Sequence, residues 1–239
     1  MSNCALSLGV QYPNQVLDME TIRTYTFETN GGTIIEEVLV EDNEIITYIN
    51  NPTKEGYTFT GWSGTGLSGS SNTSVTISKG STGDRSYTAN WVLTEYSISY
   101  ELNGGSLPSG QTNPTKYTME TATFTLNNPT RTGYTFNGWS GTGLSGSSNK
   151  TVTVSKGSTG NRSYTANWTE NSYSITYNMN GGSKETSYRE TYTITDTAFS
   201  FSYTPTRTGY TFLGWYTTST FEEGSYVSEI EKGTYENIT

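Results

Sequence analysis

A block of seven residues that occurs three times constrains the fold more than any other feature. It occupies residues 56–62, 133–139 and 209–215 and reads Gly-Tyr-Thr-Phe-x-Gly-Trp in each copy. Large rings spaced between glycines are typical of a short strand that buries one face and lets a neighbouring backbone approach closely. Since one buried Trp removes about 150–250 Å² of surface from water, each block can form the centre of a small core.

The first two copies extend far beyond the block. Residues 56–91 and 133–168 are both 36 residues long and differ at five positions. The three blocks start 77 and 76 residues apart, which indicates tandem units. We therefore predict an N-terminal leader segment at 1–22, repeat 1 at 23–92, repeat 2 at 93–169 and repeat 3 at 170–239. Repeat 3 ends before any closing Tyr-Thr-Ala-Asn-Trp segment, so we expect it to lack its closing strand.

Each repeat begins with the signal of a strand and a tight turn. In repeat 2, Tyr96, Ile98, Tyr100 and Leu102 alternate with polar residues and are followed by Asn-Gly-Gly. Alternation of this kind predicts a half-buried strand, and Asn-Gly-Gly supplies the positive φ angles of a reversal. Further short strand signals between glycine-rich turns predict four to five strands per repeat. The fold class is therefore β-dominated.

The aromatic residues of the repeated motifs are the predicted structural core, because they occupy alternating strand positions. These residues are Tyr57, Phe59, Trp62, Trp91, Tyr134, Phe136, Trp139, Trp168, Tyr210, Phe212 and Trp215. Two further aromatic residues of repeat 3, Tyr216 and Tyr226, are the candidates to face a ligand.

Composition argues against several classes of function. With 22 acidic and 13 basic residues the net charge is −9, which does not suit a nucleic-acid partner. The chain has no His and a single Cys, so we expect no catalytic residues, no bound metal and no cofactor. The acidic clusters lack the ligand order of a calcium loop and favour a solvated face. We find no apolar run for membrane insertion and no signal peptide in this chain.

The ordered motifs Asn-Gly-Gly, Pro-Thr-x-x-Gly-Tyr-Thr-Phe-x-Gly-Trp and Tyr-Thr-Ala-Asn-Trp resemble the Listeria–Bacteroides repeat, or internalin B-repeat, of bacterial surface proteins. The resemblance covers roughly residues 23–239. It implies α+β modules of the ubiquitin-like β-grasp type, with little helix, strung as stalks, and it brings no catalytic residues. Repeat 3 departs from it at residues 236–239, where family members continue into a strand that ends in Trp.

The leading hypothesis is a non-catalytic extracellular stalk or spacer of a bacterial cell-surface protein that contributes to adhesion. The next repeat begins within about five residues of each closing Trp, so we expect a semi-rigid, elongated rod. Its expected partner is a host or cell-surface protein or glycan.

Two alternatives remain open. Tyr216 and Tyr226 could stack on a carbohydrate or peptide, which would make the chain a binding module. Alternatively, the segment from Leu6 to Val10 of a neighbouring chain could supply the strand that repeat 3 lacks. Strand donation of this kind would give a polymer or a phage virion subunit, whereas the chain is otherwise expected to be a monomer. Catalysis is the least favoured reading, because Ser nucleophiles lack a His base.

Overall fold

The computed structural model describes residues 22–35, 38–41, 46–48, 51–184, 187–201 and 203–239. Every regular element within these residues is a β-strand, which confirms the β-dominated fold class. The helix that a β-grasp module would carry does not occur in this part of the chain, so the β-grasp assignment stays a prediction. The leader segment, including Leu6 to Val10, lies outside the described residues apart from Ile22.

The chain forms two compact units. One comprises the residues as far as Glu95 together with Thr118–Glu120, and the other comprises Tyr96–Tyr117 and Thr121–Thr239. The first unit holds repeat 1, and the second holds most of repeat 2 and the whole of repeat 3. Each repeat is described by itself below.

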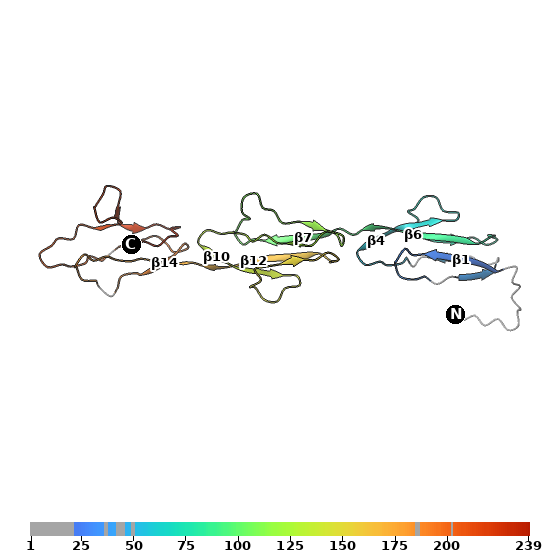
Figure 1. Ribbon diagram of the computed structural model, residues 1–239, viewed down its shortest axis with the longest axis horizontal. Helices are drawn as coiled ribbons and strands as arrows, with labels where there is room; N and C mark the ends of the chain where they lie inside the picture. The colour runs from blue at the N-terminus through green and yellow to red at the C-terminus, as the bar shows by residue number, and fades with distance from the viewer. Residues whose placement is uncertain (1–21, 36–37, 42–45, 49–50, 185–186, 202) are drawn as a thin grey trace. The chain divides into compact units, whose positions relative to one another are not determined.

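Repeat 1 is built on a mixed four-stranded sheet in which the last strand of the repeat is central (Figure 1). The strand order is β2 (Val38–Glu41), β1 (Ile22–Glu28), β6 (Arg85–Leu93) and β4 (Tyr57–Gly64). β6 is parallel to β1 and antiparallel to β4. A second, two-stranded sheet pairs β3 (Ile46–Tyr48) with β5 (Val75–Ile77).

Repeat 2 has the same central arrangement. Its sheet runs β10 (Tyr134–Gly141), β12 (Arg162–Glu170), β7 (Tyr96–Glu101) and β8 (Lys116–Tyr117). β12 is parallel to β7 and antiparallel to β10, and β9 (Phe124–Thr125) pairs with β11 (Thr153–Val154). We call β1 and β7 the opening strands, β4 and β10 the aromatic strands, and β6 and β12 the closing strands. Both closing strands hydrogen-bond on two sides.

The core of each complete repeat surrounds the Trp of its seven-residue block. Trp62 and Trp139 are 1% and 0% exposed. The Trp139 ring meets Phe136 edge-on at 5.6 Å and Tyr100 at 6.1 Å, and its strand partner Ala166 is fully buried. Burial of the indole also requires a partner for its N–H, and the Asn128 Oδ1 accepts that hydrogen bond at 2.9 Å.

The second glycine of the block marks a β-bulge. The register of β10 against β12 shifts between Phe136 and Gly138, and Gly138 has a φ of 145°. A Cβ atom at this position would lie 2.4 Å from the backbone nitrogen of Asn149. Gly61 of repeat 1 has the same bulge and a φ of 139°. The predicted close approach of a neighbouring backbone is therefore confirmed here.

The Asn-Gly-Gly turns use their residues for two different purposes. Asn103 and Gly104 have positive φ angles of 50° and 81°, as the tight reversal predicts. Gly105 has no such angle, but a Cβ there would lie 2.5 Å from Cζ2 of Trp168. The second glycine therefore has no side chain because the indole of the closing strand packs directly against its Cα. Gly32 and Trp91 repeat this contact in repeat 1.

Repeat 3 contains three separate two-stranded pairs. They join β13 (Ser172–Ser174) to β14 (Thr191–Thr193), β15 (Phe199–Ser200) to β18 (Glu229–Ile230), and β16 (Trp215–Tyr216) to β17 (Tyr226–Val227). The described residues of this repeat include no counterpart of β6 or β12. An isolated parallel bridge between Ile175 and Ile238 stands where β7 and β12 begin to pair.

Replacing the bulge glycine should destabilise repeat 2 strongly. We expect Gly138→Ala to cost about 3 kcal/mol or more, because it combines a positive φ with a clash against rigid backbone. Gly146→Ala is the matched control: its φ is 67° and a Cβ would meet nothing within 4 Å, so the cost should be about 1 kcal/mol. Hydrogen exchange of the β10 and β12 amides measures both. Equal losses of protection would contradict the assignment.

Candidate functional site

The structure places the predicted core residues unequally. Trp62 and Trp139 are fully buried, while Phe59, Phe136, Trp91 and Trp168 are partly buried and pack against the cores of their repeats. Tyr57 and Tyr134 are half-buried, as are Phe212 and Trp215. Tyr210 differs from the expectation because it is 65% exposed. No described closing strand covers this edge of repeat 3, so the Tyr210 ring remains at the surface.

Polar side chains of the closing-strand motif hold the sheet together from within. The amide Nδ2 of Asn167 donates to the Gly138 carbonyl at 3.1 Å and to Ser140 Oγ at 3.0 Å, across the bulge. Trp168 Nε1 donates to the Leu102 carbonyl at 3.0 Å. Asn103 Nδ2 donates a hydrogen bond of 2.9 Å to the Ala166 carbonyl. The conspicuous Asn and Trp residues of the motif thus tie the closing strand to both neighbouring segments.

In each repeat a basic side chain lies over the tyrosine of the seven-residue block, and this residue was not among the predicted site residues. The Arg131 guanidinium carbon lies 3.6 Å from the centre of the Tyr134 ring. Lys54 and Arg207 take the same position over Tyr57 and Tyr210, at 4.2 Å and 3.7 Å. The signal was present in the sequence, because the residue two places before the block glycine is basic in all three copies.

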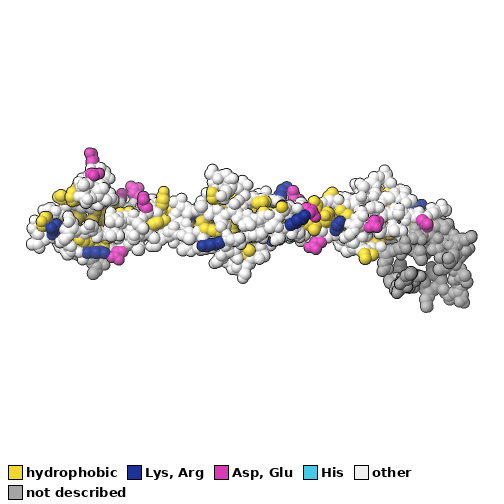
Figure 2. Space-filling view, in the orientation of Figure 1, with side chains coloured by type: hydrophobic (Ala, Val, Ile, Leu, Met, Phe, Trp, Pro, Cys, Tyr) yellow, Lys and Arg dark blue, Asp and Glu magenta, His cyan; other side chains and the backbone are white. Residues whose placement is uncertain are grey.

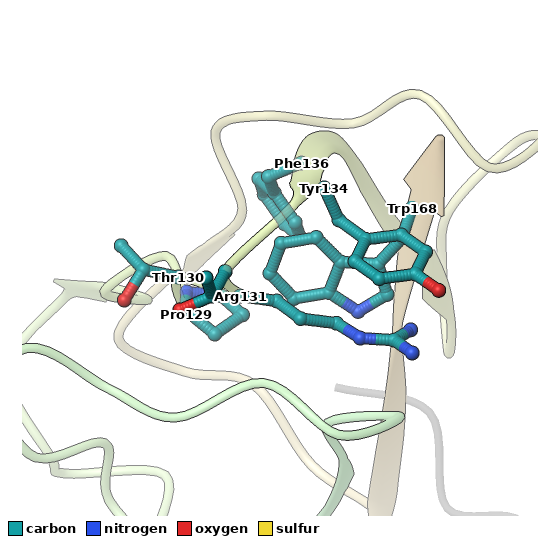
Figure 3. Close-up of a pocket in the computed structure, with 7 residues that line it drawn as sticks. Pro129, Thr130, Arg131, Tyr134, Phe136 and Trp168 are labelled. Carbon is teal, nitrogen blue, oxygen red and sulfur yellow. The ribbon is translucent and has the colours of Figure 1, made fainter. Parts of the chain in front are cut away.

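Figure 3 shows Arg131 extended alongside the rings of Tyr134 and Trp168 in a shallow pocket of repeat 2. Pro129 and Phe136 complete its apolar wall, and its volume is about 280 Å³. The Arg131 guanidinium already makes a cation–π contact with the Tyr134 ring, and the Trp168 side-chain N–H donates a hydrogen bond to a backbone carbonyl. These contacts stabilise the packing of Arg131 against the aromatic rings and leave little room for a ligand.

The two candidate ligand-facing residues lie together on the β16–β17 hairpin. Tyr216 and Tyr226 are strand partners whose rings meet edge-on at 5.6 Å. Tyr216 is half-buried because Phe221 packs edge-on against it at 5.0 Å, whereas Tyr226 is 56% exposed. The hairpin therefore presents the rings of Tyr226 and Phe221, which is 59% exposed, and each of them meets the half-buried Tyr216 ring edge-on.

A larger hollow, a groove of about 540 Å³, lies in repeat 3. One wall is the Asn-Gly-Gly turn from Asn178 to Gly182, and the other is the aromatic block from Tyr210 to Trp215, with Thr239 at the groove as well. Figure 2 shows apolar side chains at the surface of this repeat, where Leu213 is 75% exposed. We call this feature the repeat 3 groove.

Chemistry-bearing groups are sparse around these hollows. Within the described residues no group of three His, Cys, Asp or Glu side chains is placed to hold a metal ion. The same part of the chain contains no helix suited to crossing a bilayer. The marked pKa shifts belong mostly to packed tyrosines: burial, followed by the charge of Tyr164, raises the pKa of Tyr100 to about 12. The Tyr100 hydroxyl donates to the Pro114 carbonyl at 2.8 Å.

Repeats 1 and 2 share a strand order and a β-bulge, and all three repeats place a basic side chain over the tyrosine of the seven-residue block. These shared features define a tandem β-repeat protein. The model of the Listeria-Bacteroides repeat domain matches residues 24–88, 96–162 and 173–239. The chain therefore belongs to the Listeria-Bacteroides repeat family, as the motifs predicted.

Two relatives come from the bacterium Evansella cellulosilytica. One, named "Putative Gly-rich membrane protein", is 33% identical over 165 residues, which is 67% of this chain and 18% of the relative. The other, named "Putative membrane protein", is 32% identical over 203 residues, which is 82% of this chain and 28% of the relative. The match therefore spans less than a third of the length of either relative. No solved structure matches it significantly.

The cation over the block tyrosine should contribute measurably to stability. We expect Arg131→Ser to cost about 1 kcal/mol, because it removes the cation–π contact and the apolar stem that covers Trp168. Arg131→Lys should cost clearly less, since Lys54 fills the equivalent position in repeat 1. Hydrogen exchange in β10 compares the two variants. Equal destabilisation by both would argue against the cation–π contact.

The raised pKa of Tyr100 predicts a loss of stability at high pH. A free tyrosine ionises near pH 10, but in the folded chain the pKa of Tyr100 is about 12. The unfolded chain therefore releases this proton first, so the stabilisation is complete below about pH 10 and declines as the pH rises to 12. Unfolding free energies over this range should fall less steeply for Tyr100→Phe. The exposed control, Tyr235→Phe, should retain the original slope.

Proposed function

We propose that this chain is a non-catalytic spacer region of an extracellular bacterial envelope protein, and that it contributes to adhesion by carrying other parts of that protein away from the cell. The observation that carries the proposal is that the side chains of the family motif serve the repeat itself. Asn103, Asn167 and Trp168 donate their side-chain N–H groups to carbonyl or hydroxyl oxygens within repeat 2. A motif used in this way maintains a scaffold.

The connections between repeats support a stiff spacer. β6 ends at Leu93 and β7 begins at Tyr96, while β12 ends at Glu170 and β13 begins at Ser172. Connections this short leave little free chain between repeats, and tandem modules joined without slack form extended arrays. The rod shape and the β-grasp character of the modules are parts of this proposal.

An envelope location is supported by the names of the relatives, which are described as membrane proteins. The net charge of −9 suits an exposed, soluble surface. The proposed partner is a host or cell-surface protein or glycan. Tyr226, which is 56% exposed on its hairpin, is the predicted ligand-facing residue that remains accessible to such a partner.

Solution X-ray scattering of the full chain tests the spacer role. A compact chain of 239 residues would have a radius of gyration of about 18 Å, and the proposal expects a value well above it. A value close to that of a compact globule would contradict the proposal. Glycan-array binding that is lost in Tyr226→Ala and kept in the exposed control Tyr235→Ala would instead favour a carbohydrate-binding module.

A further inference from the structure

The first glycine of the seven-residue block makes a contact that its turn alone does not require. Gly133 is buried and has a φ of 77°. A Cβ atom at this position would lie within 2.8 Å of three side-chain atoms of Ile194, which belongs to repeat 3 and to the same compact unit. The absence of a side chain in one repeat therefore leaves room for an apolar side chain of the next repeat.

Met119 makes the corresponding contact with Gly56, and both residues belong to the first compact unit. The sulfur of Met119 lies 2.2 Å from the position that a Cβ of Gly56 would take. Met119 and Ile194 are also equivalent in sequence, because each lies two residues after a buried tyrosine, Tyr117 or Tyr192. Two different apolar side chains thus fill the same place beside equivalent glycines.

These apolar side chains stand apart from the cores of their own repeats. Among the described residues, the core of repeat 3 is formed around Ile175, Tyr192 and Ile230, and Ile194 is not one of the side chains packed against it. The same is true of Met119 and the core of repeat 2. Ile194 is nevertheless half-buried, and the glycine of the preceding repeat is one of its neighbours. Its apolar character therefore serves the contact between repeats.

An acidic side chain holds the turn that carries Ile194 in shape. The Asp196 carboxylate accepts a hydrogen bond of 2.7 Å from the Thr193 N–H and forms an ion pair with Arg189. The Asp196 N–H donates to the Thr193 carbonyl at 3.2 Å. Because repeat 3 fixes this turn by itself, little further ordering is needed for Ile194 to contact repeat 2.

The linker between the repeats is hydrogen-bonded to the same glycine. The Gly133 carbonyl accepts a bond of 2.9 Å from Asn171, the residue between β12 and β13. Asn171 Oδ1 in turn accepts one of 2.6 Å from Thr135 Oγ1. Thr94 repeats both contacts in the first unit, since its N–H donates to the Gly56 carbonyl at 2.9 Å and its hydroxyl bonds to a threonine of β4. The block glycine thus holds both the linker and the turn.

A carboxylate adds a polar contact between repeats 2 and 3. Glu170 Oε1 accepts a hydrogen bond of 3.2 Å from the Thr195 N–H and one of 3.4 Å from the Tyr134 hydroxyl. Thr195 directly follows Ile194, so the polar and the apolar contact use the same turn. Repeat 1 has Leu93 at the position of Glu170, which shows that the apolar contact is the shared one.

We propose that the first glycine of the block is a docking point for the turn that follows the second strand of the next repeat, and that this joint couples the two repeats. The proposal rests on the spacer role, because a stiff spacer needs contacts between neighbours as well as short linkers. The stability of a tandem array is the sum of the stabilities of its repeats and of nearest-neighbour terms. Gly133 and Ile194 supply that term for repeats 2 and 3.

Distances between spin labels test the coupling in the full chain. Thr153→Cys and Ser200→Cys place labels at exposed strand positions of repeats 2 and 3, in a Cys4→Ser background. We expect a narrow distance distribution. Ile194→Asp should broaden it at least about twofold, because a charge is unfavourable against an apolar contact surface. Ile194→Met should keep it narrow, since Met119 fills the equivalent position.

A matched pair of glycine variants tests the docking point itself. Gly133→Ala adds a methyl group against Ile194, whereas Gly157→Ala in the same repeat has a φ of 87° and meets nothing within 4 Å. Hydrogen exchange of the Asn171 and Thr195 amides should be at least about tenfold faster in Gly133→Ala than in Gly157→Ala. Ile194→Ala should accelerate the same two amides without any backbone strain.

Two results would overturn the joint. One is equal exchange in the two glycine variants, and the other is a distance distribution that is broad in the unchanged chain or remains narrow in Ile194→Asp. Scattering separates this outcome from the spacer role. An elongated chain with a broad distribution would overturn the joint alone, while a compact globule with a narrow distribution would contradict the spacer role and keep the joint.

Discussion

Both complete repeats depend on one strand that is central in the sheet and last in the sequence. β6 and β12 each hydrogen-bond to two strands, one parallel and one antiparallel. Their Ala residues lie directly opposite the buried Trp of the block, which leaves room for the indole. Because the same few residues join both halves of the sheet, hydrophobic burial and ladder pairing reinforce each other. The described residues of repeat 3 include no such strand, and they form three small strand pairs around a half-buried Trp215.

The family motif can now be understood as a set of contacts. The block Trp fills the core, and the glycine before it allows the bulge. The second glycine of Asn-Gly-Gly seats the closing indole, and the Asn binds the closing strand. The basic residue ahead of the block covers the block tyrosine. The motif thus describes a way of closing a sheet.

The sequence predicted the contacts that are local or periodic. Strand alternation, the Asn-Gly-Gly reversal and the burial of Trp62 and Trp139 all follow from spacing and ring size. The order of the strands could not be read in the same way, because the parallel pairing of β1 with β6 joins segments about 60 residues apart and no turn signal specifies it. The exposure of Tyr210 could not be predicted either, since its block has the same pattern as those of repeats 1 and 2. What differs is the strand that would cover it.

The position of the closing strand has a consequence for synthesis on the ribosome. The centre of each sheet emerges last, so a nascent repeat holds unpaired edges until its final residues leave the exit tunnel. β6 and β12 begin with the same seven residues, Arg-Ser-Tyr-Thr-Ala-Asn-Trp. The vacant centre of one repeat is therefore a template for the segment of the other. Vectorial translation protects against this exchange, because repeat 1 can close before the competing segment of repeat 2 has been made.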